Sequence, residues 1–338
     1  MTGQDAVRLI RILPECRVLV VGDLMLDEYR RGHVERISPE APVPILNVVG
    51  RDATLGGAGN VVRNLRSLHV NVTVVGVLGE LGVKGNGVVR DARRVSTRKV
   101  RYVSLEHGQQ VFRADEETTQ EVSGQVEEEI IRQVREKAAN AQVILCSDYL
   151  KGVLTARVLK AAFEAGRERN VPVIVAPKDT EARKYEGASI LMPNLKELSR
   201  LVGTAVDGDA WLTGSAGCLT RRLGLEALLV TRGSDGMTLF EPGESRLRRV
   251  DIPTVARKIY DVTGAGDTAL AAFAAGIAAG ATREAAAHLA NVAAGVVVGK
   301  HGTAVVTAKE ILEHVVESES EALGTREVPG MLRSVVGR

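Results

Sequence analysis

The sequence is short of aromatic residues and carries almost no excess of charge. Of its 338 residues only 1 is Trp, 5 are Tyr and 4 are Phe, so it lacks the rings on which single-strand-binding proteins stack nucleic-acid bases. Its 44 basic and 42 acidic side chains leave a formal net charge of +2, whereas a dedicated nucleic-acid-binding protein usually has a strong basic excess. We therefore expect no nucleic-acid partner.

Cysteines and long apolar runs are also scarce. The 3 cysteines, Cys16, Cys146 and Cys218, are far apart and match neither a disulfide framework nor a zinc site. Residues 1–16 lack the apolar core of a secretory signal. The alanine-rich segment 269–281 is too short to span a bilayer. We therefore expect a cytoplasmic protein that does not contact a membrane.

Glycine, in contrast, is abundant, with 35 residues that follow no fixed period. Because glycine has no Cβ, it serves tight turns and places where the backbone approaches a ligand. The chain is 45% hydrophobic and 25% charged, which is typical of a globular protein with a sizeable core. Glycines that cluster beside chemically active side chains are therefore the first candidates for a binding site.

Short β-branched runs alternate with segments of helical spacing along most of the chain. This alternation predicts an α/β fold with a mostly parallel sheet that helices cover on both faces. Two polar pairs of short strands, at about 28–50 and 99–113, predict a small β-flap over the larger sheet. Residues 317–338 lose the periodicity, so we expect one domain over 1–316 followed by a C-terminal tail.

The strongest motif is DVTGAGDT at residues 261–268. Gly264 and Gly266 let consecutive backbone N–H groups turn toward one point, and the helix that follows adds positive potential there. The motif therefore predicts an anion hole. Asp267 lies beside it, where a carboxylate suits a base that takes a proton from a hydroxyl attacking phosphorus. The alternative is a glycine-rich helix start with Asp267 as its N-cap.

The same residues also fit G-x-G-x-x-A, the fingerprint of dinucleotide-binding folds. That fingerprint follows a first strand and has an acidic residue at a strand end about 20 residues later. Here the motif lies late in the chain and Glu284 falls in a predicted helix, which disfavours a dinucleotide site. The sequence contains no G-x-x-x-x-G-K-[ST] motif, which excludes a P-loop NTPase.

Four motifs, in order and spacing, resemble the ribokinase-like (PfkB) family of sugar kinases. They are GGAGN at 56–60, PNLKE at 193–197, TRGSDG at 231–236 and DVTGAGDT at 261–268, and the resemblance covers about residues 15–310. It implies a three-layer α/β/α sandwich with a β-flap as a lid. It also implies an ATP-dependent carbohydrate kinase that uses Mg²⁺ and, in many members, K⁺. Flaps in this family often pair between subunits, which implies a homodimer.

Four further segments resemble the heptose 7-phosphate kinases within this family. They are GDLMLD at 22–27, RISPEAPVP at 36–44, SDYLKG at 147–152 and GKHGT at 299–303. This resemblance implies phosphorylation of the anomeric hydroxyl of D-glycero-β-D-manno-heptose 7-phosphate, a step toward the lipopolysaccharide core. The H-x-x-H signature of the nucleotidyltransferase domain in bifunctional relatives is absent, so we expect a stand-alone kinase. Two alternatives stay open, a kinase for another sugar phosphate or a nucleoside, and a non-catalytic sugar- or nucleotide-binding protein.

The resemblance assigns a role to each matching position. It makes Asp267 the base, and it makes the anion hole from the backbone of Gly264, Ala265 and Gly266. The residues expected beside ATP or Mg²⁺ are Asn194, Glu197, Thr231, Gly233, Asn291 and Gly302. The residues expected to bind the sugar are Asp23, Asp27, Gly56, Gly57 and Asn60. The neighbours expected for a monovalent cation are Asp261 and Thr263.

Some of these positions have simpler interpretations. Asn194 and Glu197 share a helical face that suits Mg²⁺ and its waters, but the same spacing is that of a helix N-cap with Glu at the third position. Arg113, Lys151 and Lys178 are candidates for binding the 7-phosphate, although a basic side chain more often lies free in solvent.

The sequence departs from the family pattern in two places. After Glu80 it runs LGVKGNG over 81–87, where the family continues with an acidic turn and a helix that helps to wall the sugar pocket. Ala176 stands before Pro177 and Lys178, where the heptose kinases commonly have Asp. We expect either departure to weaken activity, whereas the intact motif at 261–268 argues against an inactive kinase.

Overall fold

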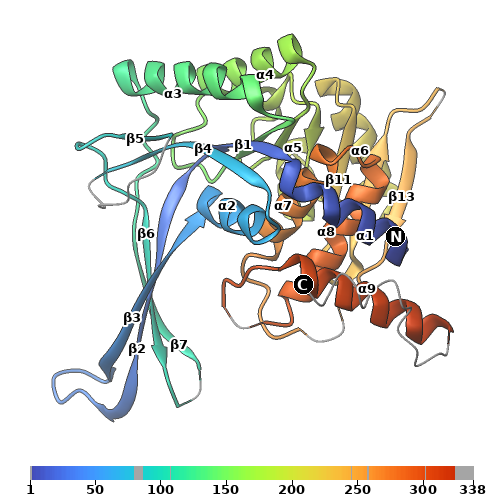
Figure 1. Ribbon diagram of the computed structural model, residues 1–338. Helices are drawn as coiled ribbons and strands as arrows, with labels where there is room; N and C mark the ends of the chain where they lie inside the picture. The colour runs from blue at the N-terminus through green and yellow to red at the C-terminus, as the bar shows by residue number, and fades with distance from the viewer. Residues whose placement is uncertain are drawn as a thin grey trace.

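The computed structural model describes residues 2–79, 87–106, 108–244, 246–256, 259–300 and 302–323. It has a body built around a nine-stranded sheet and a four-stranded flap that projects from the body (Figure 1). Within these residues, every helix is too short or too polar to cross a lipid bilayer.

The sheet of the body has the strand order β13-β12-β11-β10-β9-β8-β1-β4-β5. Its parallel part consists of β1 (Arg17–Gly22), β4 (Asn71–Leu78), β5 (Val88–Arg90), β8 (Val143–Ser147), β9 (Val173–Ala176), β10 (Ile190–Leu191) and β11 (Ala227–Thr231). The antiparallel strands β12 (Met237–Glu241) and β13 (Arg248–Ile252) extend it. The predicted mostly parallel sheet is therefore confirmed.

Helices cover both faces of this sheet (Figure 1). One face packs against α1 (Gly3–Ile12), α2 (Ala58–Ser67), α7 (Ala265–Ala278), α8 (Arg283–Val297) and α9 (Ala308–Leu323). The other packs against α3 (Gly124–Lys137), α4 (Ala156–Arg169), α5 (Leu195–Val202) and α6 (Gly208–Leu223). The predicted three-layer α/β/α sandwich is confirmed.

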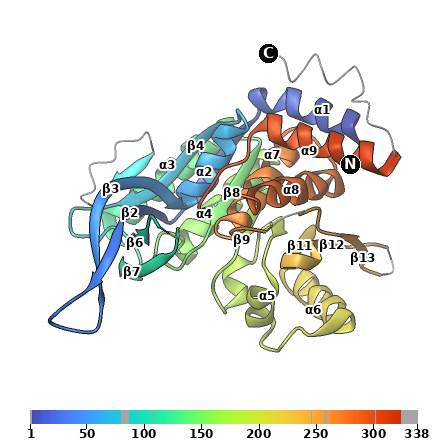
Figure 2. The same cartoon turned by 90° about the horizontal axis from the view of Figure 1, so that it is seen from below.

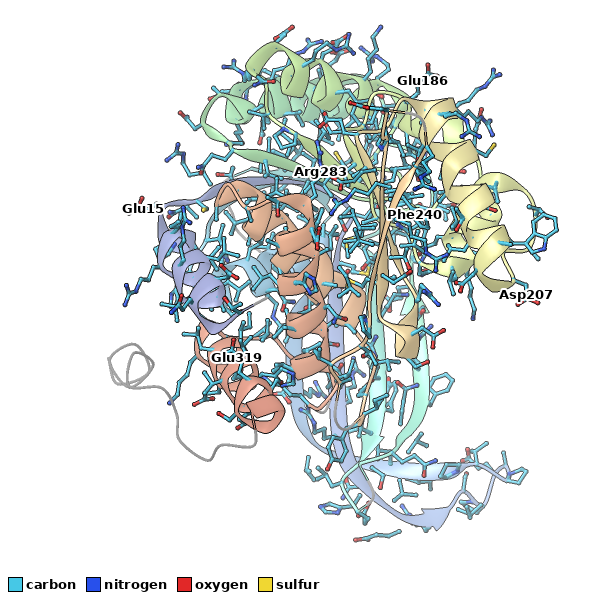
Figure 3. The ribbon with its side chains drawn as sticks, turned by 90° about the vertical axis from the view of Figure 1, so that its right-hand side faces the viewer. Glu15, Glu186, Asp207, Phe240, Arg283 and Glu319 are labelled. Carbon is cyan, nitrogen blue, oxygen red and sulfur yellow. The ribbon has the colours of Figure 1, made fainter. Side chains whose placement is uncertain are left out.

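The apolar runs of the parallel strands follow from this double cover. In β1, Val18 and Val20 belong to the hydrophobic cluster on the α7 face, whereas Leu19 and Val21 belong to the cluster on the α4 face. Successive side chains of a strand point to opposite faces, so a strand buried on both faces must be apolar throughout. The fully buried Phe240 lies in the interior of the body in Figure 3.

The flap consists of four long strands. They are β2 (Leu24–Ile37), β3 (Pro44–Gly57), β6 (Arg98–Ser104) and β7 (Gln110–Glu116), in the order β3-β2-β6-β7. The flap is thus confirmed but is longer than the predicted 28–50 and 99–113, because β2 and β3 run unbroken from the tip into the body (Figure 1).

The helix near the C-terminus differs from the sequence-based expectation. Helix α9 continues to Leu323, past the predicted domain end at residue 316, and lies beside α1 (Figure 2). The carboxylate of Glu319 accepts a hydrogen bond of 2.6 Å from the backbone N–H of Gly3. The segment 317–323 therefore belongs to the helical layer rather than to a tail, and 324–338 lie outside the described residues.

The segment that departs from the family pattern is described only in part. Residues 80–86 lie outside the described residues. Within 87–97 the chain forms β5 and turns and contains no helix. The predicted loss of a helix therefore agrees with this part of the segment and stays a prediction for the rest.

Helix α7 carries the strongest motif, and its stability depends on deep packing. Phe273 in this helix is completely buried in the hydrophobic cluster on the α7 face of the sheet. We expect Phe273→Ala to lower the free energy of unfolding by about 3–5 kcal/mol, because it leaves a cavity in the core. Denaturant unfolding measures this change. Lys160→Ala on the exposed side of α4 is the control, with an expected change below about 0.5 kcal/mol; equal losses would contradict this account of the core.

Candidate active site

Four predicted site residues and Tyr149 follow the carboxyl ends of neighbouring parallel strands. Asp23 follows β1, Tyr149 follows β8, Lys178 follows β9, Asn194 follows β10 and Gly233 follows β11. The carboxyl ends of parallel strands meet at one edge of the sheet, which is where open α/β sheets bind ligands. The topology therefore brings residues that are far apart in the sequence to one edge.

The carboxylate of Asp267 lies in the first turn of α7 and is held by two donors. The hydroxyl of Tyr149 donates to Oδ1 at 2.5 Å, and Nδ2 of Asn60 donates to Oδ2 at 2.9 Å. Arg63 donates from Nη1 to Oδ1 of Asn60 at 3.3 Å. Because a guanidinium only donates, this contact turns the amide N–H₂ of Asn60 toward Asp267.

Burial raises the pKa of Asp267 above its usual value. The hydrogen bonds from Tyr149 and Asn60 act in the opposite direction, as does the nearby charge of Lys178, whereas the charge of Asp27 adds to the rise. In its ionised form, a carboxylate with a raised pKa is a better proton acceptor than an exposed one.

The start of α7 has the backbone geometry of an anion hole. Gly264 has φ +81°, and a Cβ there would lie 2.9 Å from Nδ2 of Asn60. A Cβ at Gly266 would meet nothing within 4 Å. Among the described residues, the N–H groups of Gly264, Gly266 and Asp267 have no acceptor, whereas the N–H of Ala265 donates to the carbonyl of Val262 at 3.2 Å. The N–H groups of the predicted anion hole can therefore bind an anion, except the N–H of Ala265, which already donates to Val262.

Two cavities open on either side of this turn. A cavity of about 200 Å³ has a polar lining, with Asp148, Tyr149, Lys178, Glu197 and Asp267 among its residues. A cavity of about 300 Å³ is lined more by apolar groups, including Met237, Ile259, Val262, Ala294 and Val298. Asn194, Thr231 and Gly266 line both, so the two form one cleft with a polar and an apolar half.

The predicted nucleotide residues lie along this cleft, with one exception. Thr231, Gly233 and Asn291 line the apolar half. Gly302 does not line it; its N–H instead donates to Oδ2 of Asp261 at 3.1 Å. The contact of Gly302 with ATP therefore stays a prediction, and the loop after α8 is joined here to Asp261.

Asn194 and Glu197 have the geometry of the simpler interpretation of their spacing, the helix N-cap. They form a capping box on α5, since Oδ1 of Asn194 accepts from the N–H of Glu197 and Oε2 of Glu197 accepts from the N–H of Asn194, each at 2.9 Å. The other carboxylate oxygen of Glu197 accepts from Nζ of Lys178 at 2.8 Å in the polar half of the cleft. Their contact with Mg²⁺ stays a prediction.

The described residues contain no group of three or more His, Cys, Asp or Glu side chains that would hold a metal ion directly. The predicted cation neighbours nevertheless lie together. Both oxygens of Asp261 accept backbone N–H groups, from Thr263 at 2.8 Å and from Gly302 at 3.1 Å. The carboxylate thus joins two loops beside the start of α7.

The sequence predicts that Asp23 binds the sugar, but Asp23 is buried away from the cleft. It is only 1% exposed, and its carboxylate accepts the backbone N–H groups of Tyr149 at 2.8 Å, Lys151 at 3.1 Å and Val153 at 3.0 Å. The prediction that Asp23 binds the sugar is therefore wrong for this structure. Its carboxylate fixes the loop after β8.

Asp27 and the glycine turn lie where the flap meets the body. Asp27 on β2 is 6% exposed and accepts from Nη1 of Arg101 on β6 at 2.5 Å. A Cβ at Gly56 would lie 2.1 Å from Oδ2 of Asp27, and Gly57 has φ +58° at the start of α2. Glycine is required at both positions for β3 to approach Asp27 and then turn toward Asn60.

The three cations predicted to bind phosphate lie in two places. Lys178 is in the polar half of the cleft, paired with Glu197. The other two belong to a charged cluster on the flap and the loop after β8, which we call the flap cluster. Its ion pairs are Lys151 with Glu117 at 2.9 Å, Lys99 with Glu117 at 3.5 Å, Lys99 with Asp115 at 2.9 Å and Arg113 with Asp115 at 2.9 Å.

Sequence reasoning missed three residues of this site. Tyr149 lies within the quoted SDYLKG segment, and its position after an apolar strand was the signal that could have singled it out. Lys99 and Arg101 are neighbours on one face of β6, opposite Asp27 and Tyr29 in register. Alternation along β6 predicts that Lys99 and Arg101 share a face of the flap. Only the register with β2, which the sequence does not reveal, places them near Asp27.

Comparison with known sequences gives a family match. Residues 16–310 match the model of the pfkB family carbohydrate kinase. The Bifunctional protein HldE of Geotalea uraniireducens is 46% identical over 314 residues, which cover 89% of this chain and 63% of that protein. The protein of the same name from Pelobacter propionicus is 44% identical over 317 residues, 90% of this chain and 64% of its own. The chain thus spans less than two thirds of these relatives.

Solved structures of similar fold share much less sequence. Arabidopsis thaliana ribokinase, complexed with ribose and ATP, superimposes with a TM-score of 0.69 at 22% identity and covers 89% of this chain and 98% of its own. Escherichia coli phosphofructokinase-2, in complex with potassium, gives a TM-score of 0.72 at 17% identity, covering 90% and 99%. At these identities the likeness establishes the ribokinase-like fold.

The two glycines of the anion hole differ in what a methyl group would meet. Gly264→Ala should lower the melting temperature, because it strains a positive φ and presses on Asn60. Gly266→Ala should leave the melting temperature unchanged or raise it, since it adds a methyl group in open space within a helix. Thermal unfolding monitored by circular dichroism measures both. A Gly266→Ala protein as unstable as Gly264→Ala would contradict the geometry.

Proposed function

Because the chain belongs to the pfkB family of carbohydrate kinases, we propose that it phosphorylates the anomeric hydroxyl of D-glycero-β-D-manno-heptose 7-phosphate with ATP. The observation that carries the proposal is the carboxylate of Asp267 beside backbone N–H groups that have no acceptor among the described residues, at the junction of a polar and an apolar half-cleft. The relatives named HldE and the segment 36–44 support the choice of a heptose.

The cleft suits ATP lying along it. The apolar half, with Thr231, Gly233 and Asn291, would hold the adenosine. The γ-phosphate would then lie at the start of α7, where the N–H groups of Gly264 and Gly266 and the helix dipole oppose its negative charge. Lys178 lies on the other wall of the polar half and supplies a positive charge there.

In the proposed reaction, Asp267 accepts the proton of the anomeric hydroxyl as its oxygen attacks the γ-phosphorus. The new P–O bond to the sugar forms as the bond from the γ-phosphorus to the β–γ bridging oxygen breaks, and ADP leaves. A base with a pKa raised by burial suits this task, and the anion hole stabilises the charge that develops on the transferred group.

Two cations fit residues of the cleft. Asn194 and Glu197 would hold Mg²⁺ through its waters, since their inner atoms are engaged in the capping box; bound there, Mg²⁺ would neutralise phosphate charge. Asp261 and Thr263 would lie beside a monovalent cation. We take this cation to be K⁺, because the E. coli phosphofructokinase-2 of similar fold has been solved in complex with potassium.

The flap cluster is the proposed site of the substrate's own phosphate. Asp27 would bind sugar hydroxyls, and Lys99 is its register neighbour on β6. Lys99 and Lys151 both contact Glu117, so an anion in place of that carboxylate would meet both ammonium groups. Arg113 adds a further charge through Asp115.

We also propose that the protein is a cytoplasmic homodimer whose flaps pair. The flap carries several large apolar side chains that are exposed in the single chain. They are Ile37, Val43, Val49, Leu105, Val111 and Phe112. Contiguous exposed apolar surface favours contact with another protein, and a second flap would cover it.

The first test of this function is Asp267→Asn. We expect loss of ADP release by at least about 1,000-fold, as is usual when a base that acts in the transition state is removed, with ATP binding retained. In the unaltered protein, kcat/KM should fall as the pH drops through the pKa of Asp267, which lies above its usual value, because only the ionised carboxylate accepts the proton.

A panel of sugars distinguishes the alternatives. ADP release with ribose or fructose phosphates but not with the heptose 7-phosphate would replace the proposed substrate. Unaltered protein that releases no more ADP than Asp267→Asn with every sugar would support a non-catalytic binding protein and contradict the proposal.

The second test addresses the flap cluster. Lys151→Gln should raise KM for the heptose 7-phosphate roughly tenfold or more and leave KM for ATP unchanged, because a charge-assisted hydrogen bond to phosphate is lost. Lys160→Gln, an exposed lysine of α4, is the matched control. With the unphosphorylated heptose the effect should disappear; an equal rise in KM for both sugars would show that Lys151 does not contact the 7-phosphate.

A further inference from the structure

Tyr149 contacts the proposed base, and the function described above gives it no role. Its hydroxyl donates to Oδ1 of Asp267 at 2.5 Å. The ring is partly buried and lines the polar half of the cleft, together with Lys178 and Glu197. A tyrosine that reaches the reacting carboxylate from a different element can control how that carboxylate is oriented.

Hydrogen bonds to Asp23 and the backbone geometry fix the conformation of the loop after β8, which carries Tyr149. The buried carboxylate of Asp23 accepts the backbone N–H groups of residues 149, 151 and 153. Leu150 has φ +55°, a conformation that is costly for a residue with a side chain and persists only where the surroundings enforce it. Gly152 has φ +84°, and a Cβ there would lie 2.1 Å from the carbonyl oxygen of Gln120. The phenol of Tyr149 is therefore held in place.

We propose that Tyr149 is a positioning residue for Asp267, which holds the carboxylate in the orientation that accepts the proton of the sugar hydroxyl. With Tyr149 on Oδ1 and Asn60 on Oδ2, rotation of the carboxylate breaks a hydrogen bond on each side. An ionised carboxylate has about four lone-pair sites, so two stay available for the attacking hydroxyl. The inference rests on the proposed function, in which Asp267 is the base.

The charges around Tyr149 and Asp267 decide in which direction the loss of the Tyr149 hydroxyl shifts the pKa of Asp267. Asp267 is faced by Tyr149 and Asn60 as donors, by Asp27 from the flap and by Lys178 from the loop after β9. Burial and the charge of Asp267 raise the pKa of Tyr149 well above its usual value, with Glu197 and Asp27 adding to the rise. The phenol therefore stays protonated and donates. Its loss would raise the pKa of Asp267 further, since the donor stabilises the ionised form.

The test is the pH profile of kcat/KM for Tyr149→Phe, measured on the full chain with ATP, Mg²⁺ and the heptose 7-phosphate. We expect the acid limb to move up by about one pH unit, which corresponds to a hydrogen bond to a charged group. We also expect kcat to fall at every pH while KM for ATP stays the same. At a pH on the acid limb, kcat/KM should drop roughly tenfold more than on the plateau.

Tyr102→Phe is the control. Tyr102 lies on β6 of the flap, and its hydroxyl accepts from Nη1 of Arg30 at 3.2 Å. Because its hydroxyl does not contact Asp267, this variant should leave the acid limb at the pH of the unaltered protein. Thermal unfolding of both variants shows whether a loss of activity reflects loss of the fold.

Two results would overturn the proposal. One is an acid limb that stays in place in Tyr149→Phe. The other is a rise in KM for the sugar without any change of the limb, which would make Tyr149 a substrate ligand instead.

A measurement without turnover separates this inference from the proposed function. The ¹³C resonance of the Asp267 carboxyl carbon, assigned by its absence in Asp267→Asn, reports the pKa directly. An upward shift in Tyr149→Phe supports the contact even if no sugar is phosphorylated, whereas an unchanged pKa refutes it even if the enzyme is active.

Discussion

The site depends on one half-buried carboxylate held between two layers of the molecule. Asp267 starts α7 on one face of the sheet, Asn60 reaches it from α2 on the same face, and Tyr149 reaches it from the end of β8. Each donor is itself oriented, Asn60 by Arg63 and Tyr149 through its loop by Asp23. A buried charge is tolerated only when hydrogen bonds satisfy it, so the helix start, the glycine turn and the loop after β8 must form together.

Much of the fold could be predicted because its strands are simple to recognise. Strands covered on both faces must be apolar throughout. The continuous apolar runs of β1 and β8 therefore make these strands recognisable in the sequence. Helices α6 and α9 are harder to recognise. Helix α6 begins GDAWLTGSAG, without a clear apolar stripe, and α9 buries Ile311, Leu312, Val315 and Val316 but ends in the polar SESEAL. The flap was predicted too short because β2 and β3 pass from polar to buried residues without a break.

Some positions of the candidate site depend on local sequence, and others depend on contacts between distant parts of the chain. Short motifs contain Asp267, Gly264, Asn194 and Thr231, and the helix start and the strand ends bring these residues to the cleft. Asp23 was misplaced because its carboxylate forms hydrogen bonds across the fold, to the loop after β8. The pairing of Asp27 with Arg101 depends on the register of β2 and β6, which no local pattern encodes.

The central claim is that Asp267 and the anion hole direct a phosphoryl group to the anomeric oxygen of a sugar that already carries a phosphate. The ³¹P NMR spectrum of the protein with ATP, Mg²⁺ and D-glycero-β-D-manno-heptose 7-phosphate tests it most directly. The account predicts a new sugar phosphorus signal coupled to the anomeric proton, with the 7-phosphate signal retained and ADP formed in equal amount. ADP and inorganic phosphate without a new sugar signal would contradict it.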